Sequence, residues 1–536
     1  MTRSVQWSGP AALAVLFLFV FLFSLTPIRS YDYYWHLATG RWIVENQRLP
    51  ESDPFSLASH DEDWINGEWL FQIVLYGTNR VVGDDGVTVV KALVSAGLFV
   101  LLALYVGRSS SILVACVVAI AAWQGAAHRI DVRPESAALL LLPLAISIAL
   151  ERPTPRRTTL LALLTLLWIN LHPSALLIGP ILVLTIAGDA MGSGSDLRKF
   201  PWRARLTQVV ACGLALLLNP YGAQGIAAPV DLARFLNQSG LTNLEWLPSS
   251  PLLFPLVFVA TVATPMLWWF SGDRRGTAAR LLVFFLFAFL AIRFVRNHAF
   301  FFVALPVILA PWLPRVAGIR ARSALAAMGG IAVILVWIGH RPAGLGPDTN
   351  TFPVSAVDLL NKSGLRGNIY NPDQFGGYLI WNAYPERRTL TDGRNELYRE
   401  FFDEYETARG DSRAWRALIE KYDLTLAVDE YRTEAIKVVD GVTGEISHMP
   451  ASLAYFPRDQ WALIGWDDVA MVFARRDRHP PETIARIEWR LVPDAESAEW
   501  ATVGGSGPIA WEIDRAIDEI GQSRRLARLI QLIDSR

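Results

Sequence analysis

This sequence contains few cysteines and no large excess of either charge. Its 536 residues include two cysteines, Cys116 and Cys212, and both stand within apolar runs. This scarcity argues against a disulfide framework and against a thiolate metal site. The formal net charge is −1 at pH 7. A dedicated nucleic-acid binder would carry a strongly basic surface, so we expect no nucleic-acid partner.

Several motifs are also absent. The sequence contains no Walker-type phosphate loop, no dinucleotide fingerprint and no His/Cys cluster with metal-ligand spacing, so we expect no bound metal from this pattern. No Ala-x-Ala cleavage pattern precedes Tyr31. The first apolar run, at residues 11–28, is therefore expected to be a retained membrane span and not a cleaved signal peptide.

Apolar residues dominate the first part of the chain. Hydrophobic residues make up 52% of the sequence, charged residues only 18%, and the mean hydropathy is +0.30. Up to about residue 340 apolar runs prevail, whereas Asp, Glu and Arg become frequent beyond it. This composition predicts a polytopic α-helical membrane protein with a C-terminal soluble α/β domain. We expect a transmembrane domain at 1–340, a Pro/Gly-rich linker at 341–350 and the soluble domain at 351–536.

Runs of spanning or near-spanning length predict about eleven membrane spans. They lie at residues 11–28, 87–106, 111–124, 136–150, 158–171, 174–190, 206–219, 251–270, 279–293, 299–314 and 323–339. Alternate loops between them carry Arg and Lys, which the positive-inside rule places in the cytoplasm. The sequence thus predicts a multi-pass protein of the cell inner (plasma) membrane whose C-terminal domain is extracytoplasmic.

The opposite loops hold unusual polar residues. They comprise residues 31–86, 128–135, 170–173, 219–250 and 293–298, and they include His36, His128, His172 and His298. Imidazoles gathered on one side predict a shared cavity at the outer membrane surface. Four outer arginines near helix ends suggest an anionic group there, such as a lipid phosphate or pyrophosphate. They are Arg129, Arg133, Arg293 and Arg296. Snorkelling to headgroups and local ion pairs are the alternatives.

The first outer segment, residues 31–86, is too long for a passive connection. Asp53-Pro54-Phe55-Ser56 predicts a turn. Residues 40–46 and 64–79 have the spacing of amphipathic helices lying in the membrane interface. Asp32 and Glu68 are candidate acid/base or metal-ligand partners, because general catalysis needs a carboxylate near the reacting hydroxyl. A solvated acid in an aromatic interfacial belt is the alternative for Asp32, and a plain helix residue is the alternative for Glu68.

Short strands and helices are expected in the C-terminal third. Residues 367–370 and 424–428 predict strands, 461–466 and 469–475 a hairpin, and 399–422 and 512 onwards helices. Gly376-Gly377 predicts a tight turn, with a phosphate contact as the alternative. Asp392-Gly393-Arg394 predicts either a turn presenting Arg394 to an acceptor or a structural ion pair.

The order of these features resembles the GT-C class of integral-membrane glycosyltransferases. The resemblance rests on residues 32–42 (DYYWHLATGRW), on residues 53–56 (DPFS) and on Glu68-Trp69-Leu70, together with the expected spans and the outer soluble domain. It covers about the first 340 residues. It implies transfer of a sugar from a polyprenyl-phosphate carrier to a lipid, glycan or protein acceptor on the outer face.

The resemblance also implies roles for individual residues. Asp32 matches the first-loop aspartate that acts as general base or orients the acceptor, and His36 is the second candidate for the base. Tyr33, Tyr34 and Trp35 would exclude water and stack on sugar faces. Many members of the class have a second acid where this sequence has Tyr33, which leaves a requirement for Mg or Mn open. A transporter or flippase of a lipid-linked sugar is the rival function, but the polar residues stand at span ends and no internal repeat is evident.

Overall fold

The computed structural model describes residues 8–59, 63–192, 200–238, 244–272, 277–314, 343–432, 435–439, 443–497, 501, 509–521 and 523–534. These residues form two compact units. The helical unit comprises the chain up to residue 30 and residues 65–346, and the α/β unit comprises residues 31–64 and 347–536. The first half of the long outer segment therefore belongs to the α/β unit, whereas the sequence analysis assigned it to the transmembrane domain.

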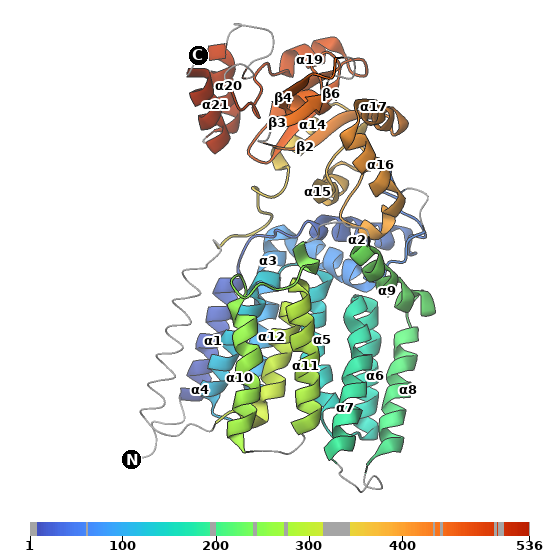
Figure 1. The fold of residues 1–536 in the computed structure, drawn as a ribbon, viewed down its shortest axis with the longest axis vertical. Coiled ribbons are helices and arrows are strands. Elements are labelled where there is room, and N and C mark those ends of the chain that lie inside the picture. Colours follow the sequence, from blue (N-terminus) through green and yellow to red (C-terminus); the bar gives the residue numbers. More distant parts are fainter. Residues whose placement is uncertain are drawn as a thin grey trace. The chain divides into compact units, whose positions relative to one another are not determined.

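The helical unit is a bundle, and Figure 1 shows its long helices running alongside one another. Its α-helices are α1 (Ser8–Ser24), α3 (Trp69–Gly107), α4 (Ile112–Ala126), α5 (Pro134–Ala149), α6 (Pro155–Leu171), α7 (Ile178–Gly192), α8 (Trp202–Leu217), α9 (Ala223–Gln238), α10 (Pro255–Ser271), α11 (Thr277–Arg293) and α12 (His298–Leu309). Short 3₁₀ turns join some of them: η1 (Ala127–Arg129), η2 (Pro173–Leu177), η4 (Leu244–Trp246), η5 (Val295–Asn297) and η6 (Ala310–Trp312).

Within the described residues, four helical segments are long and apolar enough to cross a membrane: Trp69–Gly107, Ile112–Arg129, Pro173–Gly192 and Val295–Trp312. Gly9–Ser24, Pro134–Ala149 and Pro255–Ser271 are apolar but shorter than the ~20 residues of a full crossing. The expected count of about eleven spans is therefore not confirmed, and the run at 323–339 lies outside the described residues. Large apolar side chains such as Leu101, Leu163 and Phe289 are exposed on the bundle, as in a membrane protein.

The second predicted interfacial helix is not a separate element. Residues 69–79 open α3, which continues through the run expected as a span at 87–106. The helix is interrupted at Gly83, whose φ of 68° is the left-handed conformation that glycine adopts at little cost. The hydropathy pattern missed the continuity because charged residues on either side of this glycine separate two apolar runs.

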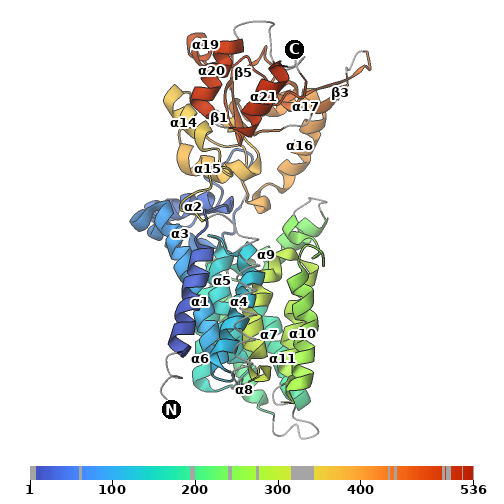
Figure 2. The same cartoon turned by 90° about the vertical axis from the view of Figure 1, so that its left-hand side faces the viewer.

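The α/β unit contains two sheets. Strands β1 (Asn368–Tyr370), β2 (Leu424–Glu430), β6 (Ala470–Arg475) and β5 (Trp461–Trp466) lie in that order in a four-stranded sheet. β1 and β2 are parallel, and the other pairs are antiparallel. β3 (Ala435–Val439) and β4 (Ile446–Pro450) form a separate antiparallel pair. Figure 2 shows this pair extending away from the larger sheet.

The helices of the α/β unit are α2 (Asp32–Asn46), α14 (Val354–Ser363), α15 (Asp373–Ala383), η7 (Asn395–Leu397), α16 (Arg399–Gly410), α17 (Ser412–Lys421), α18 (Ala451–Tyr455), α19 (Pro481–Ile487), α20 (Ile509–Ile520) and α21 (Arg524–Asp534). Several of them, among them α14, α17 and α19, pack against the larger sheet. The predicted strands at 367–370 and 424–428 and the hairpin at 461–475 are confirmed. The predicted helix at 399–422 is divided at Asp411, whose carboxylate accepts hydrogen bonds from the first amides of α17.

The glycine pair Gly376-Gly377 forms neither a tight turn nor a phosphate loop. Both glycines are buried inside α15. A Cβ at Gly376 would lie 2.1 Å from the carbonyl oxygen of Thr391, and one at Gly377 would lie 2.8 Å from that of Tyr31. The pair therefore lets the backbone of α15 approach the neighbouring chain segments.

The predicted interfacial helix at 40–46 is part of a longer helix, α2, which begins at Asp32. Its residues from Tyr33 to Gly40 are all buried, whereas a helix lying on a membrane surface would bury one stripe. The helix packs against α15. Tyr34 contacts the rings of Tyr378 and Phe352 edge-on, at centroid distances of 4.8 and 5.2 Å. α2 is thus a core helix of the α/β unit.

Candidate functional site

A buried cluster of charges holds the first outer segment to the rest of the α/β unit. It begins at the predicted turn, where Asp53 accepts hydrogen bonds from the amides of Phe55 (3.0 Å) and Ser56 (3.2 Å). Such a bond to the amide two residues on defines an Asx turn. The hydroxyls of Ser56 and Ser59 also donate to Asp53. The prediction of a turn here is confirmed.

Arg394 lies between two carboxylates. Its Nη1 atom is 2.9 Å from Oδ1 of Asp53, and its Nε donates to Oδ1 of Asp392 at 2.8 Å. The Tyr398 hydroxyl donates to Asp392 at 2.7 Å and lies 2.8 Å from the Ser56 hydroxyl. We call Asp53, Ser56, Asp392, Arg394 and Tyr398 the Arg394 cluster.

Complete burial defines the electrostatics of the Arg394 cluster. The side chains of Asp53, Asp392 and Arg394 are 0% exposed. Burial alone would raise the pKa of Asp53, but the Arg394 guanidinium and the two serine hydroxyls lower it below its ordinary value. For Tyr398, burial and the nearby Asp392 raise the pKa well above its ordinary value. The hydroxyl therefore stays protonated and donates.

Arg394 is a structural residue and not an exposed acceptor contact. Its guanidinium lies over the rings of Trp64, Phe55 and Trp35, at 4.6, 5.5 and 5.8 Å. Carboxylates and aromatic rings surround it, so no face is left for a substrate. Of the two alternatives for Asp392-Gly393-Arg394, the structure favours the ion pair, and the predicted role of Arg394 in substrate binding is corrected accordingly.

Asp32 begins α2, where its negative charge is favourable to the helix dipole. The side chain is partly exposed, unlike the buried residues that follow it. The Trp35 indole donates to its Oδ1 at 3.3 Å. A Cβ at Gly393 would lie only 3.1 Å from the same oxygen, so the Arg394 cluster abuts Asp32 through a glycine.

Burial raises the pKa of Glu396, and the charges of Asp392 and Asp32 raise it further, whereas Arg394 lowers it.

The aromatic residues after Asp32 point into the protein. Tyr33 is 0%, Tyr34 2%, Trp35 6% and His36 1% exposed. The rings of His36 and Trp35 are tilted by 37° and their centroids are 3.6 Å apart. Rings this buried contact other protein rings, so we assign Tyr33 and Tyr34 to packing in place of the predicted stacking on sugars. The same burial makes His36 a poor candidate for the base.

In the helical unit, two of the four arginines that were predicted to lie on the outer face are paired. Arg129 lies 2.7 Å from Glu135 and 2.5 Å from Glu245, and Arg133 lies 2.9 Å from the same Glu245 oxygen. Burial alone would raise the pKa of Glu245, but attraction and hydrogen bonds from Arg129 and Arg133 lower it to about 2. Of the alternatives, a local ion pair therefore forms between Arg129 and Glu135.

The other two arginines face aromatic rings. Arg293 lies over Phe294 at 4.6 Å, and Arg296 lies over Trp246 at 4.5 Å. Neither has a carboxylate partner among the residues that the structure describes. Cation–π contact leaves the edge of a guanidinium free to donate. The four predicted phosphate-binding arginines therefore divide into a paired set, Arg129 and Arg133, and an available set, Arg293 and Arg296.

The predicted histidines lie in three different places. His128 and His298 meet at 3.2 Å, and His298 also contacts the Ser249 hydroxyl at 2.6 Å. His172 lies 3.8 Å from Glu68. Burial, followed by the charges of Arg296 and Arg129, lowers the pKa of His172 to about 3, so its ring is neutral and this contact is not an ion pair. His36 belongs to the α/β unit.

The described residues include no group of three or more His, Cys, Asp or Glu side chains arranged to hold a metal ion.

Sequence reasoning missed several of the charged residues that organise these clusters. Glu135 and Glu245 were not recognised as partners because they are 6 and 116 positions from Arg129. Asp53 was recognised as a turn residue but not as the partner of Arg394, which is 341 positions away. The available signal was the presence of two serines, Ser56 and Ser59, close to Asp53. The turn itself does not need both of their hydroxyls.

Comparison with solved structures identifies the architecture. The chain superimposes on the apo oligosaccharyltransferase of Archaeoglobus fulgidus with a TM-score of 0.56 at 10% identity, covering 84% of this chain and 75% of that one. The chain has a GT-C fold. The resemblance seen in residues 32–42 is thereby confirmed at the level of fold.

Two further structures of the archaeal enzyme agree. The complex with an inhibitory peptide and a dolichol-phosphate gives a TM-score of 0.51, and the form tethered to an acceptor peptide with an NVT sequon gives 0.52. Both are 11% identical and cover 83% of this chain and 74% of theirs. No protein-family model matches the sequence, and no curated protein matches it either. The likeness to the archaeal enzyme is therefore one of fold.

Proposed function

We propose that this protein is a membrane glycosyltransferase that moves a sugar or oligosaccharide from a polyprenyl-phosphate carrier to an acceptor on the outer face of the membrane. The observation that carries the proposal is the GT-C fold over more than four fifths of the chain. The related archaeal structures contain a dolichol-phosphate and acceptor peptides, which supports a lipid-linked donor and makes a protein acceptor the first choice over a lipid or glycan.

The available arginines would bind the phosphate of the donor. A guanidinium presents paired N–H donors that match phosphate oxygens and stays charged at any relevant pH. Arg293 and Arg296 have no carboxylate partner among the described residues, and the rings beneath them fix their orientation. When the bond from the sugar carbon to the phosphate oxygen breaks, negative charge grows on the leaving phosphate. Two nearby guanidiniums would stabilise that charge.

Arg129 and Arg133 would contribute through Glu245. This carboxylate bridges both guanidiniums, and its side chain is 34% exposed. A donor phosphate has the charge and the oxygen acceptors to take the same position. In the proposal, Glu245 thus occupies the donor-phosphate position until the donor arrives, and then releases Arg129 and Arg133 to it.

Asp32 would receive the proton of the acceptor. The acceptor atom loses a proton as it attacks the sugar carbon, and a carboxylate can take that proton. Among the residues that the resemblance implicates, Asp32 is partly exposed, whereas Tyr33, Tyr34, Trp35 and His36 are buried. The Trp35 indole donates a hydrogen bond to the Asp32 carboxylate, and the absence of a side chain at Gly393 leaves room for it. His36 lacks such access.

The test is loss of label from the lipid phase when purified protein meets radiolabelled polyprenyl-phosphate sugars and a mixture of peptides. This readout reports cleavage of the donor, and label in the peptide fraction reports the acceptor class. Asp32→Asn keeps the shape and hydrogen bonding of the side chain but removes its basicity, so turnover should fall ~10²–10⁴-fold.

Glu45→Gln is the matched control, because Glu45 lies at the exposed far end of the same helix. It should retain parental turnover. Near-parental turnover in Asp32→Asn would remove Asp32 from the mechanism. A parent protein that leaves all label in the lipid phase, but carries lipid-linked sugar between the leaflets of a vesicle, would favour the flippase instead.

A further inference from the structure

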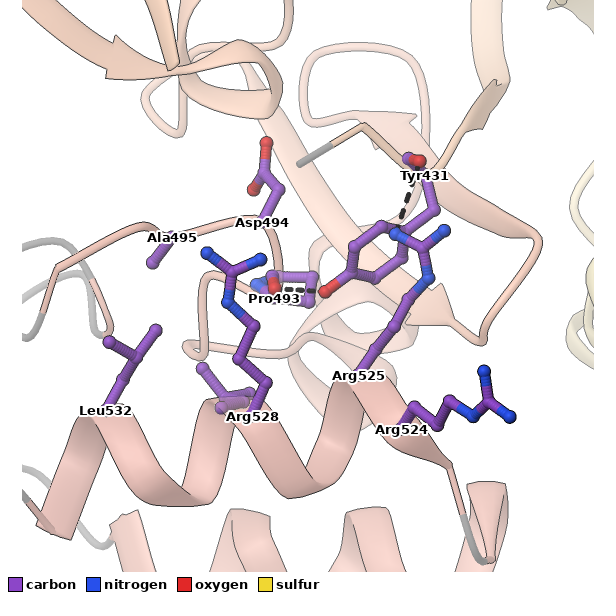
Figure 3. A pocket seen from close by; sticks show the side chains of 9 residues that line it. Tyr431, Pro493, Asp494, Ala495, Arg524, Arg525, Arg528 and Leu532 are labelled. Carbon is purple, nitrogen blue, oxygen red and sulfur yellow. Dashed lines mark hydrogen bonds between the residues drawn. The ribbon is translucent and has the colours of Figure 1, made fainter. Parts of the chain in front are cut away.

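The α/β unit contains a cavity that is not part of the proposed transferase site. It has a volume of about 210 Å³ and lies between α21 and residues 493–495. Leu529 and Leu532 form an apolar part of its wall. Figure 3 shows the side chain of Arg528 pointing from α21 toward Asp494 and that of Arg525 pointing toward Tyr431, while Arg524, which also lines the cavity, extends to the side. Three arginines on so small a wall require an explanation.

Protein groups account for only one of these arginines. Arg525 lies over the Tyr431 ring at 3.8 Å and donates to the Tyr431 carbonyl oxygen at 3.4 Å. Arg524 and Arg528 are both exposed. In the part of the chain that the structure describes, neither forms a hydrogen bond or an ion pair. Two guanidiniums are therefore available at the cavity.

The carboxylates near the cavity already have partners. Asp494 is 2% exposed, and both its oxygens accept from Ser452, from the hydroxyl at 2.5 Å and from the amide at 2.9 Å. Asp468 accepts from the Ser523 hydroxyl, which in turn caps the first turn of α21. The described residues that line the cavity include three arginines and one carboxylate, that of Asp494. The cavity therefore has an excess of positive charge.

This arrangement is unfavourable for the helix itself. Arg524 and Arg528 are four positions apart, so they lie on one face of α21 and repel each other. Cations in the first turn also oppose the helix dipole, which favours acidic residues there. The first turn of α21 contains no acidic residue. A bound anion would relieve both costs, because guanidiniums donate to oxyanions with matching geometry.

We propose that this cavity binds the phosphate group of a ligand, with Arg524 and Arg528 as its principal contacts and Arg525 as the anchored third. The volume is below the range of sites for drug-sized molecules, so it suits a phosphate or diphosphate group with at most a small substituent. The ligand is either a soluble phosphate ester or the headgroup of an anionic lipid. This site would bind whether or not the protein transfers sugars.

The test is titration calorimetry of the full-length protein in a neutral detergent with inorganic pyrophosphate, at constant ionic strength. The double variant Arg524→Gln, Arg528→Gln should bind ~10- to 100-fold more weakly than the parent. Arg413→Gln is the matched control, because Arg413 is an exposed arginine in the first turn of α17 that does not line this cavity. Equal binding by the parent and the double variant would overturn the proposal, as would the absence of binding by the parent.

Nanodiscs distinguish the two sources of the phosphate group. If the ligand is a lipid headgroup, discs containing phosphatidic acid should abolish pyrophosphate binding, whereas phosphatidylcholine discs should preserve it. Equal binding in both kinds of disc assigns the site to a soluble phosphate ester. Because all the substituted arginines are exposed, the variants should unfold at the parental temperature. A large drop in that temperature would mean that the arginines are structural, and would overturn the site.

Discussion

Arginines occupy contrasting positions in the two units of this protein. Arg394 of the α/β unit is 0% exposed and lies between the carboxylates of Asp53 and Asp392. Arg296 of the helical unit is partly exposed and lies on the Trp246 ring. The first guanidinium has all its charge compensated by protein, and the second has its charge uncompensated by any described carboxylate. Compensation, more than the residue type, separates a structural arginine from one that can bind a ligand.

The helical unit contains the intermediate case. Arg129 is nearly as buried as Arg394 and likewise has two carboxylate partners, but one of them, Glu245, is 34% exposed. A carboxylate that reaches solvent costs less to displace than one that is sealed in the core. The arginines therefore range from structural ones, such as Arg394, to available ones, such as Arg296. Substitutions at the two ends of this range should have different measurable effects.

The largest effect is expected from Arg394→Met. Removing the guanidinium leaves the buried carboxylates of Asp53 and Asp392 without a countercharge, which should cost about 3–5 kcal/mol of unfolding free energy. The measurement is denaturant unfolding of the detergent-solubilised protein, followed by tryptophan fluorescence. Arg413→Met, an exposed arginine, is the control. Adding Asp53→Asn should restore part of the loss. Unchanged stability in Arg394→Met would mean that the Arg394 cluster is not structural.

The available arginines should differ from the paired ones in what they affect. Arg296→Ala and Arg293→Ala should each weaken binding of polyprenyl phosphate by about 1.5–3 kcal/mol, the value of a charge-assisted hydrogen bond, at parental stability. Arg129→Ala should lower stability as well, because it leaves Glu135 buried without its partner. Arg234→Ala, on the exposed surface of α9, is the control for both measurements. Parental binding by both available-site variants would indicate that these arginines contact headgroups only.

A smaller effect should follow from Gly376→Ala, which places a Cβ atom against Asp392 of the Arg394 cluster. The new Cβ would lie 2.6 Å from the Cα atom of Asp392, so α15 or the Asp392 segment must move, at a cost of about 1–3 kcal/mol. Gly410→Ala is the matched control, since no atom lies within 4 Å of its Cβ position. Thermal unfolding of the two variants tests the difference. Equal unfolding temperatures would show that the close approach of α15 is not required.

The last effect depends on pH. The pKa of His172 falls from its ordinary 6.5 to about 3 in the folded protein. Between these values the unfolded chain binds a proton that the folded one does not, so stability is full above pH 6.5 and decreases as the pH falls towards 3. His172→Gln should reduce the difference in unfolding temperature between pH 8 and pH 5. An unchanged difference would indicate that His172 titrates normally.

Local patterns predicted much of the fold. Two short apolar runs on either side of Asp467-Asp468 gave the hairpin at 461–475, and the polar string at 53–56 gave the turn, because both depend on neighbours in the sequence. The apolar runs located most helices of the bundle. Their ends and their capacity to span were less certain, because a hydropathy run does not show where a helix bends, as at Gly83 of α3. The glycine pair in α15 was misassigned because the segments that it contacts are distant in the sequence.

By itself the sequence determined the class of the protein: a membrane chain with an α/β part, a conspicuous aspartate after its first helix and arginines near its outer helix ends. Only the tertiary structure decided which of those charges are already compensated. Asp53 pairs with Arg394, which is 341 positions away, and Glu245 pairs with Arg129, which is 116 positions away. Neither pair can be inferred from the spacing of the residues along the chain. Because the free energy of a buried charge depends on its partners and on its distance from water, the division of the arginines into structural and available ones exists only in the folded protein.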